Sequence, residues 1–216
     1  MAMLKSGLNR AQWIAVVQAC AFFAIALGIV QPLSTSYATE VASNGVSDII
    51  LSNIPVYNVD AIFVYGMFLF LGFVAFLCFQ HPRRIPFTLN AVALFVVIRS
   101  VFVSLTHVGP FLPHMSSQFG PTITHIFFGS DFFFSGHTGA PFLLALIYWR
   151  EKAIRTVFLL WSMVFATVVL LGHVHYSIDV ASAYFITYTI YHIALNIFSK
   201  SREWFLQDDP VEKQAI

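Results

Sequence analysis

Charged residues are scarce in this sequence. Only 10% of its 216 residues are Asp, Glu, Lys or Arg, against about 25% in a typical soluble domain. A soluble domain needs far more charge to cover its surface, so the shortage excludes a water-soluble enzyme. The formal net charge is +1 and no basic patch exists to displace counterions, which argues against nucleic acid as a partner.

Cysteine is nearly absent as well. The two cysteines, Cys20 and Cys78, both lie inside apolar runs, so they provide neither a disulfide framework nor a cysteine metal site. Apolar residues are abundant instead: 58% of the chain is hydrophobic, 24 residues are phenylalanine and the mean hydropathy is +0.79. The length fits one domain. We therefore expect a single all-α, polytopic membrane domain over residues 1–216.

Six apolar runs are candidates for membrane-spanning helices, each of which needs roughly 20 apolar residues. The fourth run is short and contains Pro141, which is tolerable near a helix start because the first amide groups lack partners there. The runs cover residues 13–30, 61–79, 87–105, 137–149, 157–171 and 178–198.

The basic residues indicate how these six spans are oriented. Ten of the 11 Lys and Arg residues fall on one side of the six-span arrangement. The loops of the other side, about residues 32–58, 106–136 and 172–177, contain no Lys or Arg. The positive-inside rule then predicts that both termini are cytoplasmic, including a tail over 203–216.

Two features of the N-terminal region allow more than one interpretation. Residues 36–38, Ser-Tyr-Ala, resemble a signal-peptide cleavage site, although the preceding apolar run is longer than a usual signal core. Residues 44–54 place four apolar side chains on one helical face, which fits a short helix on the outer membrane surface. A loop whose apolar residues pack on the bundle fits equally well. The four residues are Val46, Ile49, Ile50 and Ile54.

The first polar cluster surrounds Arg99, the one base inside a predicted span, about two turns from its outer end. A charge within the membrane is costly and by default marks a functional site. The alternative is that Arg99 extends along the helix to the interface.

The second cluster is Gly-Ser-Asp-Phe-Phe-Phe-Ser-Gly-His-Thr-Gly over residues 129–139. We expect the chain to turn at Ser135 and Gly136 and to begin a helix at His137. Backbone N–H groups at a helix start favour an anion, and a histidine there can give a proton to a leaving oxygen. Ser-Gly-His by itself also fits a simple capped turn.

The third cluster contains His173, His175 and Asp179. On a helix, His175 and Asp179 share a face, and His173 would point elsewhere. The carboxylate can fix the tautomer of His175 and leave its other nitrogen as nucleophile or base. A structural hydrogen bond and a two-histidine, one-carboxylate metal site are the alternatives. Phosphoryl transfer through histidine needs no metal, and we expect neither a metal nor another cofactor.

Together these motifs resemble the sphingomyelin synthase family, a branch of the lipid phosphate phosphatase (type-2 phosphatidic acid phosphatase) superfamily. The resemblance is carried by residues 131–138 and 175–180 and covers about 95–190, the expected catalytic core. In the third span, five residues match the spacing of a family motif. They are Arg99, Phe102, Thr106, Val108 and Pro110.

The resemblance implies a catalytic triad of His137, His175 and Asp179 on the non-cytoplasmic face. Family enzymes move a phosphocholine or phosphoethanolamine group from a glycerophospholipid to ceramide and release diacylglycerol. The expected partners are therefore a phospholipid donor, the diacylglycerol product and a lipid alcohol acceptor. The residues expected to bind substrate are Arg99, Asp131, Ser135, Gly136, Thr138 and Tyr176.

Three departures from the family pattern concern the acceptor. Gly129 and Ser130 stand where the family has a cysteine before Gly-Asp, the Pro-rich first-loop motif is reduced to residues 54–56, and no soluble N-terminal domain is expected. Two other activities stay open. One is a phosphomonoesterase acting on phosphatidate or a polyprenyl diphosphate, and the other is non-catalytic lipid binding or transport.

The basic elements of lipid phosphate phosphatases argue against the monoesterase. Those enzymes carry Lys-six residues-Arg-Pro and an Arg before the second histidine, whereas position 169 here is valine. A phosphodiester with a zwitterionic head group needs fewer cations. Outer-loop aromatic residues could hold its quaternary ammonium by cation–π contact, although most of these rings fit core packing better. They are Tyr57, Phe127, Phe132, Phe133 and Phe134.

Overall fold

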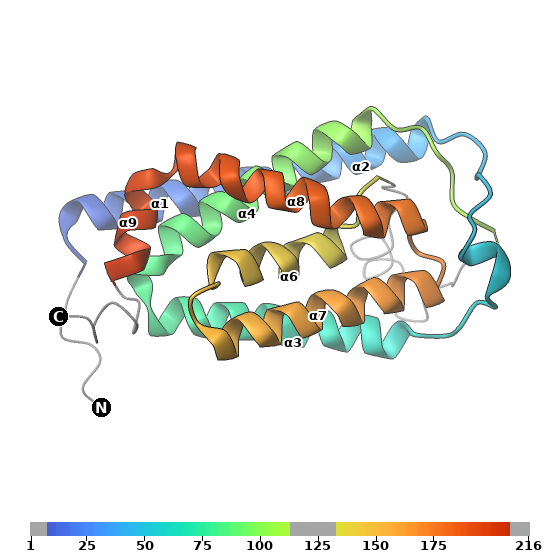
Figure 1. Ribbon diagram of the computed structural model, residues 1–216. Helices are drawn as coiled ribbons and strands as arrows, with labels where there is room; N and C mark the ends of the chain where they lie inside the picture. The colour runs from blue at the N-terminus through green and yellow to red at the C-terminus, as the bar shows by residue number, and fades with distance from the viewer. Residues whose placement is uncertain (1–7, 113–132, 208–216) are drawn as a thin grey trace.

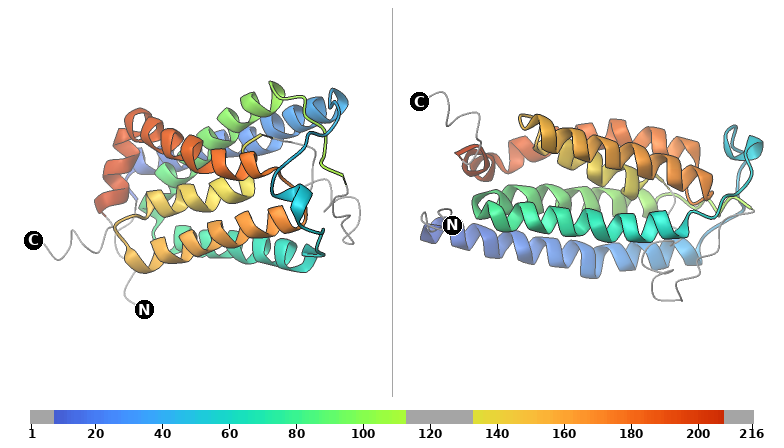
Figure 2. Two further views of the ribbon diagram at one scale, coloured as in Figure 1. Left: turned by 45° about the vertical axis from the view of Figure 1, so that its right-hand side comes forward. Right: turned by 90° about the horizontal axis from the view of Figure 1, so that it is seen from below.

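The computed structural model of the chain describes residues 8–112 and 133–207. All regular elements in these two ranges are helices, so the all-α class is confirmed. The α1–α2 rod, α3, α4, α6, α7 and α8 lie lengthwise in one bundle and alternate in direction (Figure 1). Helix α4 lies between the α1–α2 rod and the group formed by α6, α7 and α8 (Figure 2).

The first helical rod is longer than the predicted run 13–30. It consists of α1 (Arg10–Ile25), a π-helical turn (Ala26–Val30) and α2 (Gln31–Glu40). Proline at position 32 has no N–H to donate to the carbonyl four residues earlier, and the helix widens by one residue just before it. The Ser-Tyr-Ala stretch that resembled a cleavage site lies inside α2.

The later helices agree with the predicted apolar runs to within a few residues. They are α3 (Asp60–Gln80), α4 (Ile85–Ser104), α6 (Gly136–Ile147), α7 (Lys152–Leu171) and α8 (Ser177–Ile197). Helix α9 (Ser199–Gln207) follows the last predicted run and was not predicted from the sequence. Short 3-10 turns at Leu51–Asn53 and Pro82–Arg84 precede α3 and α4.

Four helices of the described chain are long and apolar enough to cross a membrane: α1–α2, α3, α4 with its preceding turn, and α7. Helix α6 has 12 residues and spans only about 18 Å, less than the roughly 30 Å hydrocarbon core. Helix α8 has 21 residues but carries Asp179, His192 and Asn196. The protein is therefore an integral membrane protein by composition, whereas the count of six spans is not confirmed and stays a prediction.

The short helix α6 lies at the centre of the bundle and packs against α7, α8 and α4. A Cβ atom added to Gly139 would lie 2.7 Å from Thr187 Oγ1 and 2.9 Å from the Phe95 ring, so a glycine lets α4 and α8 approach α6 closely. Because protein surrounds α6, its backbone does not have to match the thickness of the lipid. Phenylalanines fill the surrounding core, including Phe134 and Phe158.

The two ends of the bundle differ in charge. The described Lys and Arg residues other than Arg99 all lie where α1, α4 and α7 begin and where α8 leads into α9; we call this the basic end. The opposite end carries the loops before α3, after α4 and between α7 and α8 (Figure 1), and we call it the site end. The predicted tail 203–216 begins within α9, where Phe205 is buried against Phe87 and Tyr148, and 208–216 lie outside the described residues.

Residues 44–54 form a loop that contains a single 3-10 turn at Leu51–Asn53, so the interpretation as a surface helix over the whole segment is wrong. The Asp48 carboxylate accepts hydrogen bonds from the N–H groups of Ile50 and Leu51 at the entry to this turn. The packing that the loop alternative expected is made by Leu51, which is buried, whereas Val46 and Ile49 are exposed.

Candidate active site

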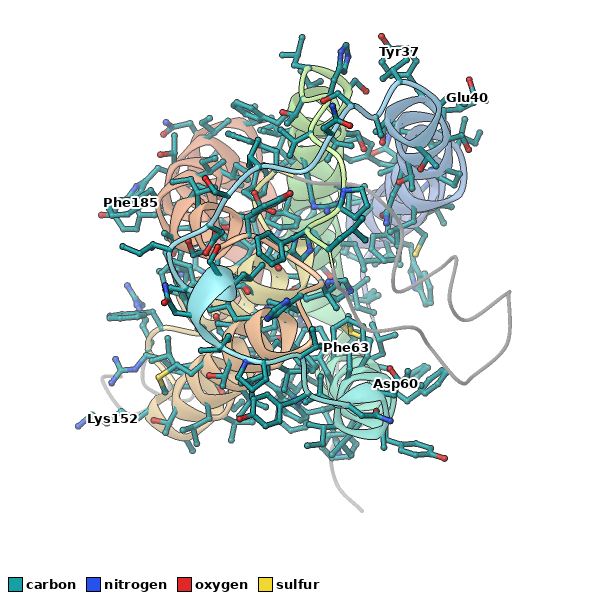
Figure 3. The ribbon with its side chains drawn as sticks, turned by 90° about the vertical axis from the view of Figure 1, so that its right-hand side faces the viewer. Tyr37, Glu40, Asp60, Phe63, Lys152 and Phe185 are labelled. Carbon is teal, nitrogen blue, oxygen red and sulfur yellow. The ribbon has the colours of Figure 1, made fainter. Side chains whose placement is uncertain are left out.

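The second and third polar clusters come together at the site end. Helix α6 begins at this end with Gly136 and His137, and α8 begins beside it with Ser177. Figure 3 looks onto this end, where the loop that follows α2 crosses in front of the helix ends. The Ser135 N–H donates to the Asp179 carbonyl at 2.9 Å, which joins the two helix starts directly.

His175 and Asp179 form the predicted pair, but by a different geometry. His175 Nδ1 lies 3.2 Å from Asp179 Oδ2, and both residues are buried. Helix α8 begins at Ser177, so His175 precedes the helix and the expectation of a shared helical face is wrong. The Asp179 side chain folds back over the helix start, where it also accepts the Tyr176 N–H at 3.1 Å. Asp179 therefore reaches His175 as a helix-capping residue.

His137 lies in the first turn of α6, where the sequence predicted a helix start. Ser135 is the N-cap, and its hydroxyl accepts the Thr138 N–H at 3.3 Å. The centroid of the His137 ring lies 6.0 Å from that of His175 and 4.6 Å from that of Phe63. Phe63 extends from α3 toward the middle of the bundle (Figure 3) and is fully buried. The two histidines are thus close enough for one phosphoryl group to lie between them.

Arg99 is buried and lies against the start of α6, so the alternative that it extends to the membrane interface is wrong. Its Nε donates to the Phe134 carbonyl at 3.2 Å. A Cβ atom on Gly136 would lie 3.0 Å from Arg99 Nε, so the absence of a side chain at Gly136 lets the guanidinium approach the helix. An arginine beside a helix N-terminus creates a positive environment that suits phosphate.

The chain enters α6 through a strained residue. Phe133 has a φ of 116°, a conformation that costs a non-glycine residue about 1–3 kcal/mol. Its ring stacks on Phe102 with centroids 5.3 Å apart, and Phe134 packs on Phe95 at 5.5 Å. Phe134 is fully buried, so the ammonium-binding role considered for it is wrong. Phe127 and Phe132 lie outside the described residues.

Two of the predicted substrate-binding side chains are hydrogen-bonded within the protein, and a third is buried. The Ser135 hydroxyl caps α6, and the Tyr176 hydroxyl donates to the Gly109 carbonyl at 2.8 Å. Thr138 is fully buried, and its backbone carbonyl accepts a hydrogen bond from the Ser162 hydroxyl. Burial raises the pKa of Tyr176, which keeps its hydroxyl neutral and able to donate. Asp131 lies outside the described residues.

His173, the other histidine of the third cluster, lies just before α8 and packs against an aromatic ring. It precedes α8 with a left-handed φ of 53°, and its ring packs edge-on against Phe111 with centroids 5.3 Å apart. The prediction that it points away from His175 assumed a helix that already includes His173. Helix α8 begins only at Ser177, so that premise is wrong, and the direction of His173 relative to His175 stays a prediction.

Asp48 was not identified as a site residue from the sequence. One carboxylate oxygen, Oδ2, accepts both the N–H and the hydroxyl of Ser177 at 2.7 Å each. Burial alone raises the pKa of Asp48, but hydrogen bonds from Ser177 and the loop backbone outweigh burial and hold the pKa below its ordinary value. The one sequence signal that could have drawn attention to Asp48 is the scarcity of acidic residues in the first outer loop (32–58), which has only two, Glu40 and Asp48.

Within residues 8–112 and 133–207, no three His, Cys, Asp or Glu side chains converge as metal ligands do. The metal-site alternative therefore gains no support from the described part of the chain. That the reaction needs no metal stays a prediction.

The site has the parts that phosphoryl transfer requires. A carboxylate lies at one nitrogen of His175, an arrangement that can leave the other nitrogen available for attack, and the His137 ring lies near enough to exchange a proton with a group bound between them. The start of α6 and Arg99 supply positive potential for a phosphate.

Comparison with known families agrees with this chemistry. Residues 129–196, which include both site histidines and Asp179, match the family described as PAP2 superfamily C-terminal. Comparisons with curated proteins and with solved structures gave no match. The family match supports membership of the PAP2 (type-2 phosphatidic acid phosphatase) superfamily of membrane phosphatases and phosphotransferases, and it does not distinguish the sphingomyelin synthase branch.

Proposed function

We propose that this protein is a phospholipid head-group phosphotransferase of the sphingomyelin synthase type. It moves phosphocholine or phosphoethanolamine from a glycerophospholipid to an alcohol such as ceramide, or to water, and releases diacylglycerol. The observation that carries the proposal is the His175–Asp179 pair with the His137 ring 6.0 Å from that of His175.

The reaction proceeds in two displacements at phosphorus. In the first, Nε2 of His175 attacks the phosphorus, the bond to the diacylglycerol oxygen breaks, and protonated His137 gives that oxygen its proton. In the second, neutral His137 takes a proton from the acceptor hydroxyl, whose oxygen attacks the phosphohistidine and releases His175. A covalent intermediate divides one difficult step into two easier ones, and His137 acts first as acid and then as base.

The charge of the outer half favours a phosphodiester over a phosphomonoester. The loops 32–58, 106–136 and 172–177, which belong to the same side as the site, contain no Lys or Arg. Arg99 is therefore the one Lys or Arg that the sequence provides on this side. A diester carries one negative charge, whereas a monoester dianion brings a second charge that is strongly penalised in a site of low dielectric constant. A zwitterionic head group also brings its own cation.

The distribution of Lys and Arg supports an active site on the non-cytoplasmic face. The described basic residues other than Arg99 gather at the end opposite the site, and the positive-inside rule places such an end in the cytoplasm. A single cysteine at exposed Ile49, in a chain with Cys20 and Cys78 replaced by serine, tests this orientation. We expect a membrane-impermeant maleimide to label this cysteine in intact cells. Labelling only after lysis would indicate the opposite orientation.

The decisive experiment is turnover of labelled phosphatidylcholine, phosphatidylethanolamine and phosphatidate by the purified protein, with and without ceramide. We expect diacylglycerol plus a head-group product, with diesters preferred over phosphatidate by at least about tenfold, or roughly 1.4 kcal/mol of barrier. Faster release of inorganic phosphate from phosphatidate would establish the phosphomonoesterase instead. No product from any of these lipids would favour lipid binding or transport.

Removal of divalent metal ions tests the same mechanism. Because two histidines and an aspartate carry out the proposed transfer by themselves, we expect full activity in excess chelator. Loss of activity on chelation, with recovery on adding zinc or magnesium, would favour metal-assisted hydrolysis.

A further inference from the structure

The start of α8 is held by two carboxylates from distant parts of the chain. Asp179, within the helix, accepts the N–H of Tyr176 and faces His175. Asp48, from the loop before α3, accepts both donors of Ser177. The first N–H groups of a helix have no partner within it, so these donors need acceptors from elsewhere. Each carboxylate satisfies its own set.

The loop that carries Asp48 is fixed on its N-terminal side by the loop that follows α4. The Ser43 N–H donates to the His107 carbonyl at 2.8 Å, and the Gly109 N–H donates to the Asn44 carbonyl at 3.3 Å. A Cβ atom on Gly45 would lie 2.5 Å from the Pro110 oxygen, so the two loops touch backbone to backbone. The position of Asp48 is therefore set by the loop that follows α4.

Tyr176 fastens the same two loops to the α8 start. Its hydroxyl donates to the Gly109 carbonyl at 2.8 Å and accepts the Val46 N–H at 3.1 Å. The side chain adjacent to His175 is thereby part of one hydrogen-bonded unit with the loop of Asp48.

Asp48 is the buried charged residue of the loop 44–54, whose other buried residue is the apolar Leu51. Its exposed fraction is 8%, against 52% for Val46 and 82% for Ile49. A carboxylate is rarely buried unless it is fully hydrogen-bonded, and Asp48 accepts four hydrogen bonds, two of them from Ser177. If Asp48 were absent, the amide and hydroxyl of Ser177 would have Asp179 as a nearby carboxylate acceptor.

We propose that Asp48 is a positioning residue of the active site: by binding Ser177 it keeps the Asp179 carboxylate committed to His175. The inference rests on the proposed role of the His175–Asp179 pair. It assigns to the first outer loop a function in catalysis that does not involve contact with substrate.

The test compares Asp48→Asn with Asn53→Ala. In Asp48→Asn, one of the two carboxylate oxygens is replaced by an NH2 group, which cannot accept a hydrogen bond. Either Ser177 or the loop backbone therefore loses its acceptor. Asn53 donates to the Ile49 carbonyl in the same loop, and its described hydrogen bonds stay within that loop, so its alanine variant is the matched control. We expect Asp48→Asn to lower kcat about tenfold or more with KM changed less than about twofold, since misplacement of a catalytic group lowers the rate steeply. Asn53→Ala should keep wild-type kcat.

Milder variants cover the case in which Asp48→Asn folds poorly. Ser177→Ala removes one of the two donors to Asp48 and should lower kcat by about threefold, a loss comparable to that of one hydrogen bond. Ser177→Thr keeps the hydroxyl and should recover most of that loss.

A second readout is independent of the lipid that the enzyme turns over. In protein labelled with 15N-histidine, NMR reports the tautomer of His175, assigned with His175→Gln. We expect the Nδ1-protonated form in the wild type, a mixture of tautomers in Asp48→Asn, and no further change when Asp48→Asn is added to Asp179→Asn. Unchanged kcat and tautomer in Asp48→Asn, with only a lower Tm, would overturn the proposal. A preference for phosphatidate would overturn the proposed substrate and leave this result intact.

Discussion

The two ends of the bundle use buried charge in different ways. At the basic end, Arg84 is fully buried, bonds Glu151 at 2.6 Å and lies over the rings of Tyr148 and Phe205 at 5.6 and 5.0 Å. At the site end, Arg99 donates to a backbone carbonyl beside the start of α6. A buried cation that has its own carboxylate is costly to separate from it, whereas a cation placed at a helix N-terminus favours an incoming anion.

Helix α6 shows the same contrast within one element. Its C-terminal carbonyl at Ile147 accepts a hydrogen bond from Arg202 Nη1 at 3.1 Å, so the protein's own cation satisfies the negative end of the helix dipole. Its N-terminus faces His175 and Arg99 instead. Substitutions at the two ends should therefore separate activity from stability.

The largest expected effect is on activity at the site end. We expect His175→Ala to lower kcat by at least about 1,000-fold, because the nucleophile is lost. His137→Ala should be similarly inactive on natural lipids but regain activity on a phosphocholine ester whose leaving group needs no proton. Turnover of labelled phospholipid measures both effects.

The matched control for these variants is His192→Ala. His192 lies near the C-terminal end of α8, away from the site, and its ring packs against the rings of Tyr188 and Tyr191. Its replacement should preserve turnover. Failure of an activated leaving group to rescue His137→Ala would indicate that His137 binds phosphate rather than protonating the leaving oxygen.

The second effect is on stability at the basic end. Glu151→Gln leaves the buried Arg84 guanidinium without its carboxylate, and breaking such a pair should lower the free energy of unfolding by about 3–5 kcal/mol. Thermal unfolding in detergent measures the loss. We expect unchanged kcat per folded molecule and a smaller loss in the double variant Arg84→Met/Glu151→Met. A fall in kcat without a fall in Tm would contradict the division between the two ends.

The third effect concerns Arg99 and should be intermediate. Arg99→Ala should lower kcat/KM on phosphatidylcholine by about 100-fold and Arg99→Lys by about tenfold, because only a guanidinium pairs bidentately with phosphate oxygens. Arg99→Met keeps most of the apolar stem and separates lost charge from lost packing. Equal activity of the lysine variant and the wild type would show that a single point charge suffices.

The smallest effect is the pH dependence of stability that Asp48 contributes. The folded-state pKa of Asp48 is lowered, so its contribution is present above the unfolded pKa of about 3.9 and is lost as the pH falls through the folded pKa. The Tm difference between wild type and Asp48→Asn should be constant near neutral pH and shrink below about pH 4. The Tm difference between wild type and Asn53→Ala should stay constant over the same pH range. If the Tm difference for Asp48→Asn also stayed constant below about pH 4, the lowered pKa assigned to Asp48 would be contradicted.

The sequence by itself determined the class of the protein and two local features of the candidate site. Scarce charge and long apolar runs dictate a helical membrane protein, because a backbone in lipid must satisfy its own hydrogen bonds. The start of a helix after Ser135 and the pairing of His175 with Asp179 are local, so neighbouring residues were enough to predict them.

Tertiary structure decided what lies next to what. Asp48 and Ser177 are 129 positions apart, and Arg99 reaches the start of α6 only because α4 packs beside it. Helix α6 can be shorter than a membrane span because its neighbours bury it, and its 12 residues leave the predicted six spans unconfirmed. Such contacts depend on how helices pack across the whole bundle, and no pattern of neighbouring residues encodes that packing.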